Sequence, residues 1–522
     1  MNIVQVVNNQ RNYFQSGATL DVEFRLSTLR KLKSAILENK DKIYDAFKND
    51  LNKCEFDVDA TELGMVCKEI DFMLSHLKRL AKPKRVKTSL LNFSSRGYIY
   101  PEPYGVVLVV APWNYPLQLS LIPLVDAIAS GNTVVLKPSN YTSSVAKVIK
   151  DILSIFNDKY ISVVLGGREQ NQELFDQKFD FIFFTGGTTV AKLLMEKASK
   201  NLTPCVFELG GKSPCIVNKY ANIDLAAKRI VWGKYLNAGQ TCVAPDYVLV
   251  NESIKDEFLA ACKKYIEKFY YEKQLLVGDE IYPYSKKLER QKVKQLSLLK
   301  NVDTKSQIES DIIDGGSDSD NNGRDVEADN NCDVADIKTR VVLTDNFPFI
   351  VNEKHKERLK GLIDADKVYV GNEWSGRRLS PTILQNVTWD DAVMGEEIFG
   401  PILPVLTFNN LYDMLRDLKS HDKPLACYIF GCDKGEEEMI LREFSFGGGC
   451  VNDTIMHLTE ERLPFGGVGL SGMGSYHGKK SFETFSHYKS VLKKSNLIDL
   501  NIRYMPYTKG KSKITKTIFG IK

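Results

Sequence analysis

The first candidate for chemistry is Cys242, in the sequence NAGQTCVAP. The chain holds ten cysteines, and a buried structural thiol is the ordinary role of such a residue. Here glycine, glutamine and threonine precede the cysteine and an Ala-Pro pair follows it, which predicts a turn that presents the side chain. Because a thiolate in an electropositive setting is a strong nucleophile, Cys242 is a candidate for covalent catalysis.

A carboxylate and an amide, Glu208 and Asn114, each lie at the end of an apolar strand. Glu208, in VFELGGKSP, directly follows an apolar strand and precedes two glycines, which would let a cofactor or another backbone approach closely. Asn114, in APWNYP, closes another apolar strand. A surface glutamate and a turn-forming asparagine are the ordinary interpretations. The catalytic alternatives are a general base and an N–H donor to an oxyanion.

Two further strings suggest binding of a phosphate or a ribose. Lys137, in LKPSN, ends a strand, and its ammonium could reach ribose hydroxyls or a phosphate. Gly186 and Gly187, in FTGGTTVAK, precede a helical pattern, where free backbone N–H groups and the helix dipole favour a pyrophosphate. The string is not the GxGxxG fingerprint.

These residues follow strands that alternate with helices. The strands are continuous apolar runs, which are typical of a parallel sheet buried on both faces, and the alternation predicts an α/β, doubly wound fold. Ligands in such folds bind at the carboxyl ends of the strands, where these motifs lie. Residues 19–80 show apolar residues at helical spacing. Strands are predicted at 105–111, 133–137, 161–165 and 179–184, with helices near 117–130, 142–156 and 188–200.

Composition excludes several other classes of protein. With 70 basic and 66 acidic residues the net charge is only +4, which gives no case for nucleic-acid binding. No apolar run reaches the roughly 18–20 residues that span a bilayer, and the N-terminus does not resemble a secretory signal. No CxxC pair occurs, so we predict reduced thiols and no metal site.

Two segments are unusually charged. Residues 311–336 carry nine acids and one base with few large apolar residues, so we interpret about 280–342 as an insertion with a disordered centre. Residues 489–522 carry nine bases and one acid. The tail is either a frayed end or a basic amphipathic segment that lies on an anionic membrane.

Taken together, PWNYP, KPS, FTGG, ELGGKSP, GQTC, EEIFGP and LPFGGVGLSGMGSYHGKKSFETFSH occur in one order. In this the chain resembles the aldehyde dehydrogenase superfamily, apart from the insertion and the extreme tail. The short N-terminal region and SGMGSYHGKKSFETFSH resemble the class 3 branch, and the nearest likeness is to fungal fatty (hexadecenal) aldehyde dehydrogenases.

The resemblance implies roles for individual residues. Cys242 would be the nucleophile, Glu208 the base that activates water, and Asn114, with the Cys242 N–H, the oxyanion donor. The resemblance also implies NAD as the cofactor, with NADP as an alternative because Asn140 replaces a glutamate that would repel a 2′-phosphate. The cofactor-binding residues would be Lys137, Asn140, Gly186, Gly187, Glu397 and Phe399. Trp113, Tyr115 and Tyr235 are candidates for pocket walls.

The resemblance also implies domains and partners. Residues 1–82 and 104–208 would form the cofactor domain, 209–465 the catalytic domain, 83–103 and 475–495 oligomerisation arms of a homodimer, and 496–522 a basic tail. We predict a cytoplasmic enzyme with peripheral contact to a mitochondrial outer membrane, endoplasmic reticulum or lipid droplet.

For the substrate, we predict medium- or long-chain fatty aldehydes. The alternatives are an aromatic or broad-range enzyme, for example one acting on 4-hydroxybenzaldehyde, and, remotely, an inactive scaffold at a membrane surface.

Overall fold

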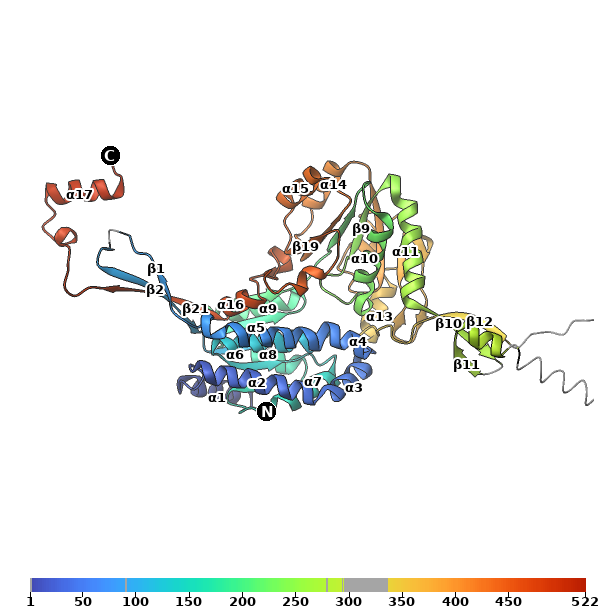
Figure 1. The fold of residues 1–522 in the computed structure, drawn as a ribbon, viewed down its shortest axis with the longest axis horizontal. Helices are drawn as coiled ribbons and strands as arrows, with labels where there is room; N and C mark the ends of the chain where they lie inside the picture. Colours follow the sequence, from blue (N-terminus) through green and yellow to red (C-terminus); the bar gives the residue numbers. More distant parts are fainter. Residues whose placement is uncertain (1, 90–91, 278–279, 293, 295–336) are drawn as a thin grey trace, which may run out of the picture. The chain divides into compact units, whose positions relative to one another are not determined.

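The computed structural model describes residues 2–89, 92–277, 280–292, 294 and 337–522. The chain divides into two compact units, one formed by residues 1–261 with 348–522 and the other by 262–347. The first unit contains two large sheets and all the candidate site residues (Figure 1).

The first sheet has six strands in the order β20-β7-β6-β3-β4-β5, and only β20 is antiparallel to its neighbour. β3, β4, β5 and β6 are buried along their whole length, which explains their continuous apolar runs. This confirms the predicted doubly wound parallel sheet. The strands are β3 (Val106–Val110), β4 (Thr133–Lys137), β5 (Ile161–Val163), β6 (Phe181–Thr185), β7 (Cys205–Glu208) and β20 (Gly472–Met473).

Three of the four crossover helices of this sheet, α6, α7 and α9, begin and end close to the predicted positions. The four helices are α6 (Gln118–Ser130), α7 (Ser143–Leu153), α8 (Arg168–Phe175) and α9 (Thr188–Ser199). The sequence analysis missed α8, which is short and strongly polar. α6 is buried along almost its whole length, so it shows little of the amphipathic pattern of a surface helix.

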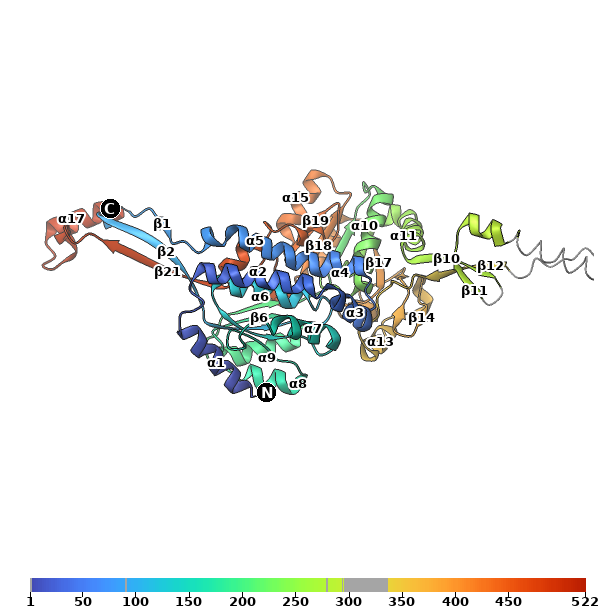
Figure 2. The same cartoon turned by 60° about the horizontal axis from the view of Figure 1, so that its bottom comes forward.

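The N-terminal residues form helices that pack on α6 and the first sheet. α2 and α5 run side by side and both contact α6 (Figures 1 and 2). Asp21 caps α2 by accepting from the N–H groups of residues 23 and 24. One π-helical turn, Asp59–Leu63, separates α4 from α5. The helices are α1 (Ile3–Gln15), α2 (Val22–Glu38), α3 (Lys40–Leu51), α4 (Glu55–Val58) and α5 (Gly64–Leu80).

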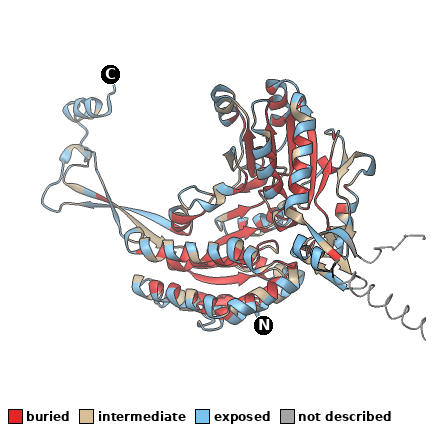
Figure 3. Ribbon diagram, turned by 45° about the vertical axis from the view of Figure 1, so that its right-hand side comes forward, coloured by how far each residue is buried: buried red, intermediate tan, exposed pale blue. Residues whose placement is uncertain are grey.

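The second sheet has seven strands in the order β13-β16-β17-β9-β8-β18-β19, and all pairs except β13–β16 are parallel. β8, β9, β16 and β18 are fully buried (Figure 3). The strands are β8 (Pro214–Val217), β9 (Tyr247–Asn251), β13 (Val368–Val370), β16 (Thr382–Leu384), β17 (Ile402–Phe408), β18 (Ala426–Phe430) and β19 (Gly448–Val451). The helices of this region are α10 (Ile223–Tyr235), α11 (Lys255–Tyr270), α13 (Glu353–Lys360), α14 (Leu411–Lys419) and α15 (Lys434–Glu443).

The two segments predicted as arms pair with each other. β2 (Ser95–Pro103) is hydrogen-bonded to β21 (Ser486–Lys494) in an antiparallel register, and β1 (Lys84–Val86) pairs with the other edge of β2. α16 (Gly478–Thr484) precedes β21, and the tail forms a helix, α17 (Lys509–Phe519). Among the described residues, no helix is long and apolar enough to cross a bilayer.

The second unit contains a small antiparallel sheet in the order β11-β10-β12. Its strands are β10 (Tyr271–Val277), β11 (Glu280–Pro283) and β12 (Ile337–Leu343). The acidic stretch 311–336, at the centre of the predicted insertion, lies outside the described residues.

Candidate active site

The turn after β3 holds Asn114, which is 2% exposed. Its main-chain carbonyl accepts hydrogen bonds from Lys53 Nζ at 3.2 Å and from Asn237 Nδ2 at 2.9 Å. Its side-chain oxygen has no hydrogen-bond partner among the described residues. The backbone of this turn is therefore fixed by two buried donors, and the amide side chain is left available for another contact.

Cys242 follows a short left-handed stretch of backbone. Asn237, Ala238 and Gly239 have φ values of 53°, 52° and 73°, which most residues avoid. At Gly239 a Cβ would lie 2.2 Å from the main-chain oxygen of Gly400, so only glycine fits there. The left-handed stretch follows the end of α10, and Cys242 lies half-buried after it, between buried neighbours.

The two residues before the cysteine anchor this segment. Gln240 is fully buried, and its amide nitrogen donates to Asn237 O at 3.1 Å and Phe349 O at 2.9 Å. Its amide oxygen accepts from the Val351 N–H at 3.0 Å. Thr241 Oγ1 shares a hydrogen bond of 2.6 Å with the Tyr115 hydroxyl. The buried polar contacts of Gln240 and Thr241 therefore fix the position of Cys242, which explains why these residue types precede it.

Glu208 ends β7, where it pairs with Gly472 of β20, and is 1% exposed. In the part of the chain that the structure describes, neither of its carboxylate oxygens has a hydrogen-bond partner. Burial raises the pKa of this carboxyl well above its ordinary value. A carboxyl with a raised pKa is a better proton acceptor near neutral pH than an ordinary glutamate.

The thiol of Cys242 is affected by the same surroundings. Burial, together with the carboxylates of Glu397 and Glu208, raises the pKa of this thiol to about 12. A thiol with a raised pKa holds its proton more tightly and must lose it before the sulfur attacks. Asn237, just before the cysteine segment, donates to the Asn114 turn, and the charge of Glu208 raises the pKa of the Cys242 thiol. The three residues predicted for chemistry therefore lie in one region of the structure.

The residues predicted for cofactor binding line the ends of the first sheet and the loop before β17. Lys137 is buried at the end of β4, and its ammonium donates to Gly166 O at 2.7 Å and Pro138 O at 2.9 Å. Burial lowers its pKa to about 8. Asn140 is exposed beside Gly167, at the start of α8.

Gly186 and Gly187 lead into α9, and Gly187 is its N-cap residue. A Cβ on Gly186 would lie 2.6 Å from the Phe184 ring, so this position is restricted to glycine by close packing. At Gly187 a Cβ would meet no described atom within 4 Å. The open N-terminus of this 12-residue helix fits a pyrophosphate group.

Glu397 and Phe399 lie in the loop between a 3-10 turn, Ala392–Met394, and β17. The Glu397 carboxylate packs so closely on Gly210 that a Cβ there would lie 2.5 Å from it. Burial raises the pKa of Glu397 to about 8, with Asp246 adding to the effect. Phe399 has a left-handed backbone, and its ring stands edge-on to Trp113 at 5.3 Å.

A cavity of about 330 Å³ adjoins these residues. It extends from Thr188, the first residue of α9, past residues 210–212 to Glu397. The open end of α9 and the buried carboxylate therefore border one space, as the two halves of a dinucleotide would require.

Of the aromatic residues predicted as pocket walls, Trp113 borders Phe399 and Tyr115 bonds to Thr241. Tyr235 is 1% exposed, and its hydroxyl donates to Thr382 O at 2.9 Å, so it packs in the core of the second sheet and not as a pocket wall.

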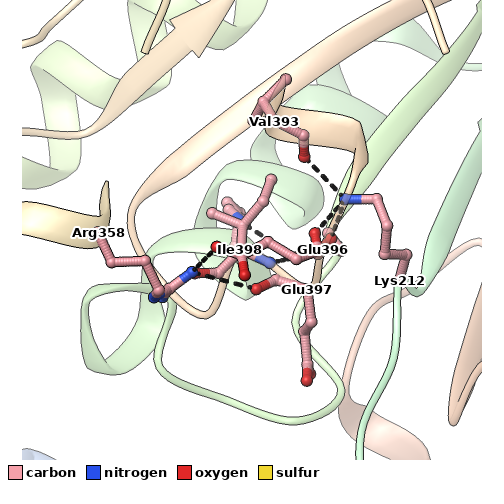
Figure 4. Close-up of polar contacts among 8 residues, drawn as sticks. Lys212, Arg358, Val393, Glu396, Glu397 and Ile398 are labelled. Atoms are coloured by element: carbon pink, nitrogen blue, oxygen red, sulfur yellow. Dashed lines mark hydrogen bonds and ion pairs between the residues drawn. The ribbon is translucent and has the colours of Figure 1, made fainter. Parts of the chain in front are cut away.

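Sequence reasoning missed the residues that hold these groups in place. Lys53 and Glu62 form a buried ion pair of 2.8 Å at the Asn114 turn. Lys212 and Arg358 hold the Glu397 loop from two sides (Figure 4). Of these only Lys212 lies in a motif, ELGGKSP, so the other three carried no local signal.

Comparisons with known proteins agree on one family. A family model described as "Aldehyde dehydrogenase family" matches residues 1–326 and 344–491. The chain is 40% identical to 4,4'-diaponeurosporen-aldehyde dehydrogenase of Staphylococcus aureus, over 99% of this chain and 100% of that protein. It is 36% identical to aldehyde dehydrogenase family 3 member A2 of Rattus norvegicus, over 97% and 92% of the two chains. A solved structure of the substrate-bound state of Staphylococcus aureus AldH has a TM-score of 0.84 at 39% identity, covering 99% of this chain and 100% of that one.

Proposed function

The chain belongs to the aldehyde dehydrogenase family, and from this premise we propose that Cys242, Glu208 and Asn114 carry out its reaction. The class 3 branch is supported by the relative named as a family 3 member. Enzymes of this family oxidise aldehydes with NAD or NADP. The observation that carries the proposal is the buried carboxylate of Glu208, which has no hydrogen-bond partner among the described residues and raises the pKa of the Cys242 thiol.

In the first step the Cys242 thiol gives its proton to Glu208, and the sulfur attacks the aldehyde carbon. The C=O π electrons move to oxygen, giving a thiohemiacetal oxyanion. The Asn114 amide and the Cys242 N–H donate to this oxygen, and losing one such donor costs about 2.7–4 kcal/mol. Bound NAD(P)+ would supply the hydride acceptor for the former aldehyde carbon, and loss of the hydride would leave a thioester on Cys242.

In the second half Glu208, after passing the thiol proton to solvent, removes a proton from a water molecule, and the resulting hydroxide attacks the thioester. The C–S bond breaks, the thiolate of Cys242 leaves, and a carboxylic acid is released. A positioned base of this kind contributes about 10²–10⁴-fold to the rate. Because burial raises its pKa, Glu208 is a stronger proton acceptor than an exposed glutamate.

For the cofactor, we assign the pyrophosphate to the open start of α9 at Gly186 and Gly187. Glu397 would accept from the nicotinamide ribose hydroxyls, and Phe399 would pack against the ring. Lys137 and Asn140 would face the adenosine ribose. The fit rests on the open N-terminus at Gly187 and on the cavity that joins it to Glu397.

For the substrate, we propose medium- and long-chain aliphatic aldehydes. The resemblance to fatty aldehyde dehydrogenases supports this class, and the Staphylococcus relative is named for 4,4'-diaponeurosporen-aldehyde. The test is the rate of reduced cofactor formation by the purified protein with hexadecanal and with 4-hydroxybenzaldehyde, each with NAD and NADP. A higher kcat/KM for hexadecanal supports the proposal. Preference for the aromatic aldehyde would replace it with the aromatic alternative.

We also propose that the tail touches an anionic intracellular membrane. Ile514, Ile518 and Ile521 recur at helical spacing and are each about half exposed. Five lysines accompany them, at positions 509, 511, 513, 516 and 522. A lysine near an anionic surface contributes about 1 kcal/mol to binding. Sedimentation with phosphatidylserine-containing vesicles, but not with pure phosphatidylcholine vesicles, is the expected result, and its loss on replacing three of the lysines by glutamine would locate the contact.

The sheet formed by β1, β2 and β21 is proposed as the surface that pairs two copies of the chain. Its outer strand exposes Tyr488 and Leu492 by 40% and 48%. Light scattering should give a dimer, and Leu492→Lys should shift it to monomer. A wild-type mass near 59 kDa would contradict this proposal.

A further inference from the structure

Asp246 lies four residues after Cys242 and is 3% exposed. Its Oδ2 accepts from Lys212 Nζ at 2.7 Å, and its Oδ1 accepts from the Ile398 N–H at 3.1 Å. Lys234 Nζ lies 4.0 Å from Oδ1, close enough for charge attraction but too far for a hydrogen bond. One carboxylate therefore links the segment after Glu208, the end of α10 and the loop that carries Glu397.

Lys212 continues this link into the loop. Besides Asp246, its ammonium donates to Val393 O at 3.0 Å and Glu396 O at 2.9 Å, which uses all three of its N–H groups (Figure 4). Arg358 holds the same loop from α13, donating to Glu396 Oε1 at 2.9 Å and Ile398 O at 2.6 Å. The backbone on both sides of Glu397 is thus fixed by charged donors.

The charges of this cluster depend on Asp246. Lys234 is fully buried, and its ammonium has no hydrogen-bond partner among the residues described. Burial lowers the pKa of Lys234 to about 8, while Asp246 opposes the effect. Without the Asp246 charge, nothing would offset the repulsion between the Lys212 and Lys234 ammonium groups. Lys212 would also lose the ion pair that holds its ammonium against the backbone of the Glu397 loop.

We propose that Asp246 is a positioning residue for the cofactor: through Lys212 and the Ile398 N–H, it fixes the Glu397 loop against the segment that carries Cys242. The proposal rests on the assignment of Glu397 to cofactor binding. It predicts that loss of the Asp246 charge displaces Glu397 and weakens binding of NAD(P), without removing any group that touches the aldehyde.

The test compares Asp246→Asn and Lys212→Met with the wild type. Asparagine keeps the size of the side chain and an acceptor for the Ile398 N–H, and it removes only the charge. Glu443→Gln is the matched control, since it removes an ion pair of 3.0 Å with Lys419 that is about 40% exposed. The dissociation constant of NADH is measured by its fluorescence enhancement on binding, and KM values are measured for cofactor and aldehyde separately.

Loss of a hydrogen bond to a charged group raises a dissociation constant by roughly ten- to a hundredfold. We therefore expect the NADH dissociation constant and the cofactor KM to rise at least about tenfold in both variants. The aldehyde KM should change less than about twofold, and the control should match the wild type in both values.

The pH dependence of NADH binding separates a charge effect from a loss of structure. An ionised Glu397 is the better acceptor for ribose hydroxyls, so affinity should increase with pH as this carboxyl ionises. The charged and titratable groups that face Glu397 are Asp246, Lys212, Arg358, Lys234 and the Cys242 thiol. Asp246 raises the pKa of Glu397, whereas Lys212 and Arg358 lower it. The midpoint should therefore fall in Asp246→Asn and rise in Lys212→Met.

An NADH dissociation constant within twofold of wild type in both variants would overturn the inference. Equal increases in the KM values of cofactor and aldehyde would also overturn it, because they indicate general damage. If Asp246→Asn does not fold, Lys212→Met decides by the same criteria. Failure of the wild type to bind NADH would instead refute the assigned cofactor site, so the two failures are distinguishable.

Discussion

Replacing Glu62 by glutamine should destabilise the protein strongly while changing hardly any volume. Glu62 lies in the π-helical turn before α5, is fully buried, and pairs with Lys53 at 2.8 Å. Its second oxygen accepts from the Gln118 N–H at 2.9 Å, and Lys53 donates to Asn114 O. Breaking a buried ion pair on one side costs about 3–5 kcal/mol because the remaining charge stays buried.

The expected fall in melting temperature follows from the size of the chain. The unfolding entropy of about 2.1 cal/mol/K per residue gives about 1 kcal/mol per degree for 522 residues. Glu62→Gln should therefore lower the melting temperature by roughly 3–5 °C. Lys53→Met/Glu62→Gln removes both charges and should recover most of the loss, because apolar replacement of a whole buried pair is often close to neutral.

Turnover should not recover with the melting temperature. In the double variant Asn114 O keeps the Asn237 donor but loses Lys53, so the oxyanion amide shifts, and a misplacement of about 1 Å can cost up to about 10²-fold in rate. The assays are a thermal melt followed by circular dichroism and the kcat for aldehyde oxidation. A melting temperature of Glu62→Gln within a degree of wild type, or a double variant no more stable than the single one, would refute this reasoning.

Three other predictions follow from the same structure. Glu208→Gln should lower turnover by about 10²–10⁴-fold while cofactor binding, measured by NADH fluorescence, stays within twofold of wild type; near-normal turnover would exclude Glu208 as the base. Burial raises the pKa of both Asp126 and Glu69, so the stability that their protons contribute is lost as the pH rises through the folded-state values. The melting temperature should therefore fall less steeply above about pH 5 in Asp126→Asn than in wild type, and parallel curves would contradict this. Asn140→Glu should raise the KM of NADP relative to that of NAD, with Asn140→Gln as the uncharged control, and an unchanged ratio would remove Asn140 from the ribose site.

The parallel sheet was predictable because its strands are continuous apolar runs that bury on both faces. β4 begins and ends at the predicted residues, and β3 and β5 fall within the predicted ranges. β6 is shifted toward its carboxyl end and includes Thr185. Asn114 and Lys137 lie at the same edge of this sheet, because a parallel sheet aligns the carboxyl ends of its strands, and their roles stay predictions.

The supports of the site could not be predicted, because they depend on contacts between distant segments. Lys53 and Asn114 are 61 residues apart, and Asp246 and Ile398 are 152 residues apart. In the sequence, a buried lysine or aspartate cannot be distinguished from the charged residues that lie on the surface of most proteins. The π-helical turn that aims Glu62 at Lys53 likewise has no local signature that we identified.

The most direct test of the account is the formation of reduced cofactor from an aldehyde and NAD by Cys242→Ala. Cys67→Ala is the matched control, since Cys67 is also half-buried but lies on α5, in a part of the chain to which we assign no role in catalysis. We predict that Cys242→Ala forms no reduced cofactor above background although it binds NADH, and that Cys67→Ala matches the wild type. Wild-type turnover that survives in Cys242→Ala would contradict the assignment of Cys242 as the nucleophile.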